Sequence, residues 1–210
     1  LGLGEYTGVE LYEALGRRAN PETKAALHEG DGKRWYAADQ IMASIGQSEN
    51  KFTPVQLCSY VTTLVNQGTR YKATFLNRVV SSDYRSVVYE NTVEVLSKMD
   101  ISDQAWNAVK VGMEKCATES GGTARKIFQD YPVKVAAKTG TAQTGILNAS
   151  DNGAFVCYAP AEKPEIAIAV YGEQAGHGSS MANIAKDILN AWFFNSDKAG
   201  DVTTDENRVS

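Results

Sequence analysis

The spacing of apolar residues predicts one firm helix in the first half of the chain. Residues 53–67 carry apolar side chains at helical intervals, namely Val55, Cys58, Val61, Leu64 and Val65. Thr53 suits the N-cap, Pro54 suits the first helical position, and Gly68 can end the helix. Weaker patterns indicate short helices at residues 9–17 and 123–128, and an ambiguous segment with a helical period at residues 35–44.

Two longer helices are predicted in the second half. The first begins after a cap at Ser102 or Asp103, and its apolar face consists of Ala105, Trp106, Val109, Met113 and Cys116. The second covers about residues 181–194. The side chains expected to pack against a sheet from this helix are Ile184, Ile188, Leu189 and Trp192.

Strand patterns are concentrated late in the chain. Residues 73–80 and 85–89 are predicted strands joined by the polar turn at residues 81–83. Three more strands are expected at residues 133–144, 153–159 and 165–172, and the last of these is rich in alternating Ile and Val. The order of elements therefore predicts a mixed α+β domain.

Composition indicates an ordinary globular domain. Of the 210 residues, 43% are hydrophobic and 22% are charged, which is enough apolar material for a core. We expect one structured portion at residues 1–194 and a disordered polar tail at residues 195–210, which lacks apolar anchors. The net charge of −4 argues against nucleic acid as a partner, and no apolar run approaches the length of a membrane helix.

Three cysteines lie at apolar positions of predicted elements. Cys58, Cys116 and Cys157 are interpreted as small buried hydrophobic side chains. Their odd number and wide spacing argue against a disulfide framework or a zinc site. Nothing in the sequence calls for a cofactor or a metal ion.

The segment VKVAAKTGTAQTG carries the chemistry that is easiest to interpret. Lys138 offers a positive charge, and Thr139 and Thr141 offer hydroxyl donors within a predicted strand. Gly140 between them lets a ligand lie close to the backbone. A strand of this kind suits a site that binds a carboxylate and polarises an acyl group. KTG is also one of three signatures of active-site serine penicilloyl transferases, beside S-x-x-K and S-x-N.

Further sequence blocks surround this motif in a fixed order. They are LGLG and TGVEL (residues 1–11), SIGQ and FTPVQL (44–57), NQGTRY (66–71), GGTA (121–124), AAKTGT (136–141) and FVCYAP (155–160). Through this succession, nearly the whole chain resembles the transpeptidase domain of class B penicillin-binding proteins. The resemblance implies a penicillin-recognising fold, like that of β-lactamases, in which helices flank an antiparallel sheet and KTGT lies on an edge strand.

The resemblance also implies an activity and roles for the four motif residues. The parent protein would be a D,D-transpeptidase that cross-links peptidoglycan stem peptides and is acylated by β-lactams. Lys138 would supply positive potential near the nucleophile and take part in proton transfer. Thr139 and Thr141 would bind the substrate carboxylate, with Gly140 allowing close approach, and the Thr141 N–H would be one of two oxyanion donors.

The nucleophilic serine of the family is expected to lie outside this chain. The string Ser48-Glu49-Asn50-Lys51 imitates S-x-x-K, but Pro54 follows too soon for a helix that starts at Ser48. Ser150-Asp151-Asn152 imitates S-x-N, yet it follows KTGT and forms a turn-like polar run. The chain is then the C-terminal part of a catalytic domain whose N-terminal part is absent, and it should be inactive alone.

Two other classes of function remain open at this stage. One is a serine β-lactamase or β-lactam sensor, which shares KTG chemistry, and the other is a non-catalytic module that scaffolds partners or binds stem peptides. For the parent protein, the resemblance implies an N-terminal membrane helix and a place on the extracytoplasmic face of the bacterial membrane. In the family, two further strands come from the N-terminal side of the domain. Without them, the strand at residues 165–172 would have an open edge, which favours self-association.

Overall fold

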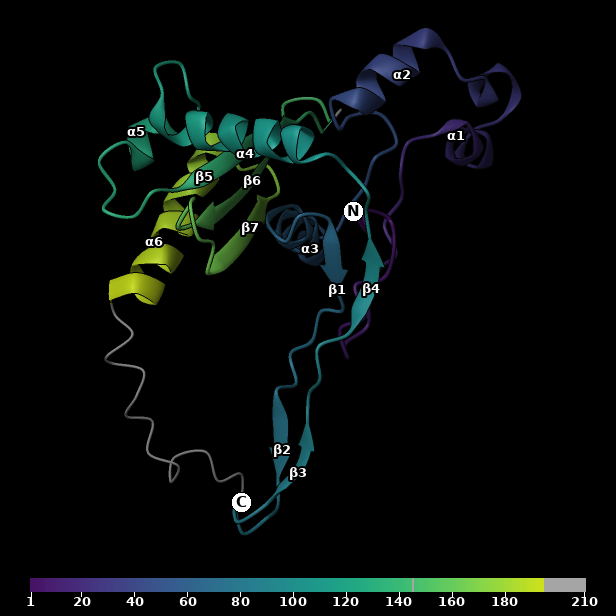
Figure 1. Ribbon diagram of the computed structural model, residues 1–210. Helices are drawn as coiled ribbons and strands as arrows, with labels where there is room; N and C mark the ends of the chain where they lie inside the picture. The colour runs from purple at the N-terminus through teal and green to yellow at the C-terminus, as the bar shows by residue number, and fades with distance from the viewer. Residues whose placement is uncertain (145, 195–210) are drawn as a thin grey trace. The chain divides into compact units, whose positions relative to one another are not determined.

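The computed structural model describes residues 1–144 and 146–194, and the tail expected at residues 195–210 lies outside this range. The chain forms two compact units, one at Leu1–Gly112 and one that begins at Met113. Both combine helices with antiparallel strand pairs, so the α+β prediction is confirmed (Figure 1). Among the described residues, no helix is both long and apolar enough to cross a bilayer.

The first unit contains the helix that the sequence predicts most firmly. Helix α3 (Pro54–Val65) has Thr53 as its N-cap, and the Thr53 hydroxyl accepts from the Gln56 N–H at 3.2 Å. Gly68 has a φ of +84°, and its N–H donates to the Thr63 carbonyl at 2.8 Å, which ends the helix as expected. Three shorter helices precede α3, namely α1 (Pro21–Leu27), the 3₁₀ turn η1 (Gly30–Lys33) and α2 (Ala37–Ser44).

The helix expected at residues 9–17 does not form. Its residues run irregularly, and their polar groups bond to distant partners instead of to each other. The Glu13 carboxylate accepts from the backbone and hydroxyl of Thr7, while the buried Gln56 side chain donates to the Leu15 carbonyl at 2.7 Å. Gly16 has a φ of +66°, which no regular helix allows. Long-range hydrogen bonds therefore override a weak local pattern.

The strands of the first unit form two small antiparallel pairs. β1 (Thr69–Tyr71) pairs with β4 (Val95–Lys98), and β2 (Arg78–Val80) pairs with β3 (Val87–Glu90). The expected turn at residues 81–83 is confirmed, and the Ser81 N–H donates to the Ser86 carbonyl at 2.8 Å. The strand expected at residues 73–80 is shorter than predicted, and β1 and β4 were not predicted.

Helix α4 (Asp103–Thr118) begins as predicted, since the Ser102 hydroxyl accepts from the Ala105 N–H at 3.4 Å. Its buried face is narrower than expected. Trp106, Met113 and Ala117 are buried, whereas Ala105 and Val109 are exposed and Cys116 is half-buried. Periodicity locates an apolar face, but the width of the buried stripe depends on what packs against it.

The second unit is built on a three-stranded antiparallel sheet in the order β5 (Ala136–Ala142), β6 (Asn152–Ala159) and β7 (Ile166–Gly172). Short helix α5 (Arg125–Phe128) precedes the sheet, and the 3₁₀ turn η2 (Gly178–Ser180) leads into α6 (Met181–Phe194). Phe128, Phe155 and Leu189 belong to the buried core between these elements. The three strands, the short helix and the last helix are confirmed close to their expected bounds.

Helix α6 lies against the sheet as predicted, but most of the side chains expected to face it do not (Figure 1). Leu189 is buried together with Met181, Ala182 and Ala185. Ile184, Ile188 and Trp192 are 48%, 41% and 51% exposed and lie on the outer side. Small alanines let the helix approach the strands closely, so the buried face is set by fit and not by residue size.

Strand β7 is at the edge of the described sheet, and its only strand partner there is β6. Because such an edge offers unpaired backbone groups, we expect the 210-residue chain to self-associate at high concentration. Tyr171→Lys places a charge on β7, where Tyr171 is 43% exposed, and should shift the chain toward monomer in light scattering. Tyr84→Lys, in the β2–β3 turn, is the matched control and should leave association unchanged. A wild-type chain that stays monomeric would contradict this expectation.

Candidate active site

The KTGT residues lie on β5, at the edge of the sheet opposite β7. The register pairs Lys138 with Val156 and Thr139 with Phe155. Since side chains alternate across a strand, Thr139 and Thr141 share the face of Phe155 and the buried core, while Lys138 lies on the other face. The motif thus presents its hydroxyls and its cation on different sides of one edge strand.

Lys138 has an exposed side chain whose Nζ donates to the Thr139 carbonyl, and among the described residues it forms no ion pair. Lys134, just before the strand, differs in this respect. Its Nζ lies 2.5 Å from Glu114 and 3.0 Å from Glu162, and the hydrogen bonds that it donates to these carboxylates raise the pKa of Lys134. The charge of Lys138 is therefore the one available to an anionic ligand.

The turn that precedes α6 contacts the side chain of Thr141. The Gly178 N–H donates to the Thr141 hydroxyl at 3.2 Å. A Cβ at Gly178 would lie 2.1 Å from the Gly140 carbonyl oxygen and 2.6 Å from that of Ala154, so only glycine fits there. At Gly140, by contrast, a Cβ would meet nothing nearer than 3.4 Å. Packing within the protein therefore does not require a glycine at position 140. That Gly140 lets a ligand approach the backbone stays a prediction.

Thr139 contacts a residue to which the sequence assigned no role. Its hydroxyl lies 2.7 Å from the hydroxyl of Thr123, and the Thr123 hydroxyl lies 3.3 Å from the Cys116 thiol. Thr123 belongs to the GGTA block, so the sequence analysis identified this segment. It did not predict the contact between Thr123 and Thr139. Gly178 was missed in the same way, because both contacts join residues far apart in the chain.

The two motif imitations do not resemble a catalytic arrangement. Ser48 is in an exposed turn with a φ of 65°, and Lys51 forms an isolated bridge with Arg17, so they do not share a helix. Asn152 begins β6, and its side-chain oxygen accepts from the Gln174 N–H at 2.9 Å. The loop predicted at residues 48–51 is confirmed, whereas Asn152 belongs to β6 and not to the turn expected at residues 150–153. That neither string acts in catalysis stays a prediction.

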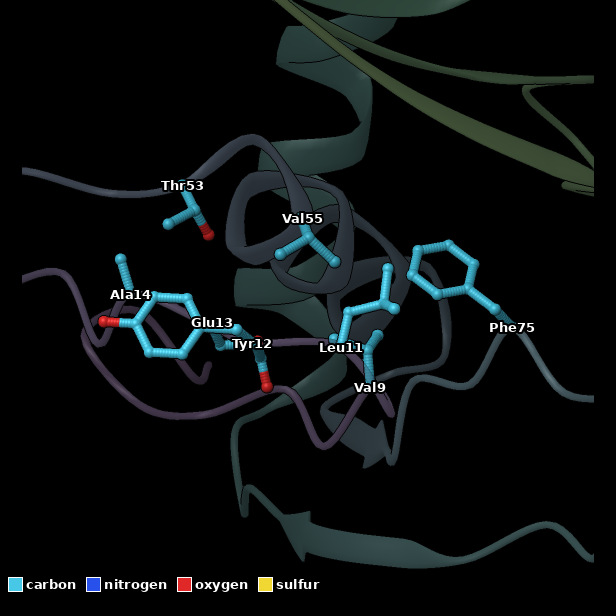
Figure 2. A pocket seen from close by; sticks show the side chains of 8 residues that line it. All are labelled: Val9, Leu11, Tyr12, Glu13, Ala14, Thr53, Val55 and Phe75. Carbon is cyan, nitrogen blue, oxygen red and sulfur yellow. The ribbon is translucent and has the colours of Figure 1, made fainter.

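A pocket of about 240 Å³ lies in the first unit, and Figure 2 shows the side chains that line it. They are Val9, Leu11, Tyr12, Glu13, Ala14, Thr53, Val55 and Phe75. Burial opposes ionisation of Glu13, but hydrogen bonds from Thr7 and Gly8 outweigh it and keep the pKa of Glu13 below its ordinary value. The Glu13 carboxylate is therefore ionised near neutral pH and accepts hydrogen bonds from the chain around it.

The thiols and potential metal ligands are also placed by the structure. Cys157 is buried as predicted, but Cys58 and Cys116 are only half-buried, and no disulfide joins the three among the described residues. The two half-buried cysteines lie on helices, Cys58 on α3 and Cys116 on α4. Within residues 1–144 and 146–194, no group of three or more His, Cys, Asp or Glu residues is arranged to hold a metal ion.

Comparison with known proteins matches residues 4–190 to the penicillin binding protein transpeptidase domain. The chain is 31% identical over 201 residues to peptidoglycan D,D-transpeptidase MrdA of Escherichia coli K12, covering 90% of this chain and 31% of the relative. The structure is similar to penicillin-binding protein 2B of Streptococcus pneumoniae R6, with a TM-score of 0.76 and 26% identity over 96% of this chain and 32% of that one.

A second similar structure is Pseudomonas aeruginosa PBP2 in complex with WCK 5153. Its TM-score is 0.72 at 26% identity, covering 92% of this chain and 42% of that one. The chain thus spans about a third of the length of the curated relatives it matches.

Proposed function

The chain belongs to the penicillin-binding protein transpeptidase domain family, and on this basis we propose that it is the carboxylate-binding part of a peptidoglycan D,D-transpeptidase. The observation that carries the proposal is the edge strand β5. It carries two oriented threonine hydroxyls on one face and, on the other, an exposed lysine without an ion pair among the described residues. The fold around that strand is the transpeptidase fold of the similar structures.

The substrate is a stem peptide that ends in two D-alanine residues. A serine hydroxyl attacks the carbonyl between them, a C–O bond forms, the C–N bond breaks, and the terminal D-alanine leaves with the proton. An amine of a neighbouring stem then attacks the ester and returns the proton to the serine, which completes the cross-link. A β-lactam opens at the same serine and stays attached.

Within this chain, the motif residues bind and polarise instead of attacking. Thr139 and Thr141 donate to the terminal carboxylate of the substrate, with Lys138 providing the opposite charge nearby. The Thr141 N–H donates to the developing oxyanion, and loss of one such donor costs about 3–4 kcal/mol of barrier. The only S-x-x-K string in the chain, at Ser48, has no helical geometry, so the nucleophile belongs to another part of the protein.

The partners of the parent protein follow from this role. They are the stem peptide, β-lactams and the N-terminal part of the same domain, and the work takes place on the extracytoplasmic face of the membrane. The anchoring helix belongs to the parent protein and not to residues 1–194.

Labelling with fluorescent penicillin tests the proposal. The full-length protein should take up covalent label, and the 210-residue chain should take up none. Label on the short chain that disappears in Ser48→Ala would show that Ser48 is the nucleophile and overturn the assignment. Rapid turnover of a chromogenic cephalosporin by the full-length protein would identify a β-lactamase instead.

A further inference from the structure

We propose that Thr123 is a positioning residue of this site, which acts through Thr139 by aiming the Thr139 hydroxyl proton at the substrate carboxylate. The inference rests on the proposed function and concerns one side chain outside the KTGT motif. It starts from the line of three polar atoms formed by the Cys116 sulfur, the Thr123 oxygen and the Thr139 oxygen, with spacings of 3.3 Å and 2.7 Å.

The direction of this line follows from counting protons. Each hydroxyl and each thiol has one proton to donate, and only the hydroxyl oxygens are good acceptors. If Cys116 donates to Thr123 and Thr123 donates to Thr139, the Thr139 proton is left for a ligand. The reverse order would direct a Thr139 lone pair at the ligand. An anionic carboxylate stabilises the first order, because it accepts a hydrogen bond and repels a lone pair.

The backbone fixes Thr123 in the position that this role needs. The Ala124 N–H donates to the Cys116 carbonyl at 3.1 Å, which ties the loop to the end of α4. A Cβ at Gly122 would lie 2.4 Å from that same carbonyl oxygen, so the loop lies directly on the helix end. Ala124 and Phe128 on the other side of Thr123 are buried in the core. The hydroxyl is therefore held at β5 by packing on both flanks.

Thr141 shows the same arrangement with a different donor. Its hydroxyl receives a hydrogen bond from the Gly178 N–H, as the Thr139 hydroxyl would from Thr123. In this arrangement each threonine hydroxyl of the motif accepts a hydrogen bond from a group on the core side of β5. A rigid amide supplies one of these donors, and Thr123 supplies the other.

The test compares Thr123→Val and Thr123→Ser in the full-length protein. The rate constant measured is that of acylation by benzylpenicillin and by its methyl ester, which lacks the carboxylate charge. Thr123→Val should slow acylation by benzylpenicillin about tenfold, because a hydrogen bond to a charged group is weakened, and should leave the ester within about twofold of wild type. Thr123→Ser keeps the hydroxyl and should restore the rate. Thr118→Val is the matched control, since the Thr118 hydroxyl donates to the Glu114 carbonyl of its own helix and not to a residue of β5.

A double-mutant cycle with Thr139→Val separates positioning from simple destabilisation. If Thr123 acts through Thr139, the double variant should be no slower than Thr139→Val alone. Equal loss with both substrates, additive losses in the double variant, or an unchanged rate in Thr123→Val would overturn the inference. Absence of acylation in the wild-type protein would instead overturn the proposed function, and this inference with it.

Discussion

Replacing Lys138 with alanine in the full-length protein is expected to slow β-lactam acylation by about a hundredfold to a thousandfold. Lys138 is exposed on the edge strand, and among the described residues no carboxylate neutralises it. Its charge therefore acts on the ligand and on the developing negative charge of the transition state. The measurement is the second-order rate constant for labelling by fluorescent penicillin.

Lys134→Ala is the control for loss of a lysine beside the same strand. That residue is held by Glu114 and Glu162, so its charge is already compensated locally. Because such surface pairs contribute little, we expect the labelling rate to stay within about twofold of wild type. A Lys138→Ala protein that labels as fast as wild type would remove the lysine from the mechanism.

Gly178→Ala should be the most damaging single methyl addition in the second unit. The new Cβ would lie 2.1 Å, 2.6 Å and 2.8 Å from three backbone atoms of Gly140 and Ala154, none of which can move without moving the sheet. Overpacking of this kind costs about 3 kcal/mol, or a fall in melting temperature of about 10 °C. Thermal unfolding of the 210-residue chain, followed by circular dichroism, measures it.

Gly112→Ala provides the opposite control within the same chain. Gly112 is inside α4, and a Cβ there would meet nothing within 4 Å. Alanine should therefore stabilise the helix by about 0.5–1 kcal/mol, because it lowers the backbone entropy lost on folding. If both substitutions lowered the melting temperature alike, the close contact at Gly178 would not be the cause.

Local signals were enough to predict the elements that begin or end at special residues. Thr53 and Pro54 mark the start of α3, and Gly68 marks its end, because capping is decided within a few residues. The alternating Ile and Val residues of β7 and the KTGT strand were found for the same reason. The four candidate residues were identified from their types together with the sequence blocks around them.

Features that depend on distant parts of the chain were not accessible in this way. The segment at residues 9–17 has a helical pattern but is held open by contacts with Thr7 and Gln56. The outward position of Ile188 and Trp192 depends on which face of α6 meets the sheet. The contacts of Thr123 and Gly178 with the motif depend on how α4, α5 and η2 pack against β5. Sequence patterns therefore identified the motif but not the residues that hold it in place.

The close approach of Gly178 to Gly140 has a consequence for how this part of the chain can vary during evolution. The 3₁₀ turn η2 contributes no residue to KTGT, yet Gly178 in it lies against the backbone of that strand, so a larger residue at position 178 damages the fold first. Cys116 is half-buried, and its side chain contacts the Thr123 hydroxyl at 3.3 Å. Position 178 should therefore vary less among related sequences than position 116.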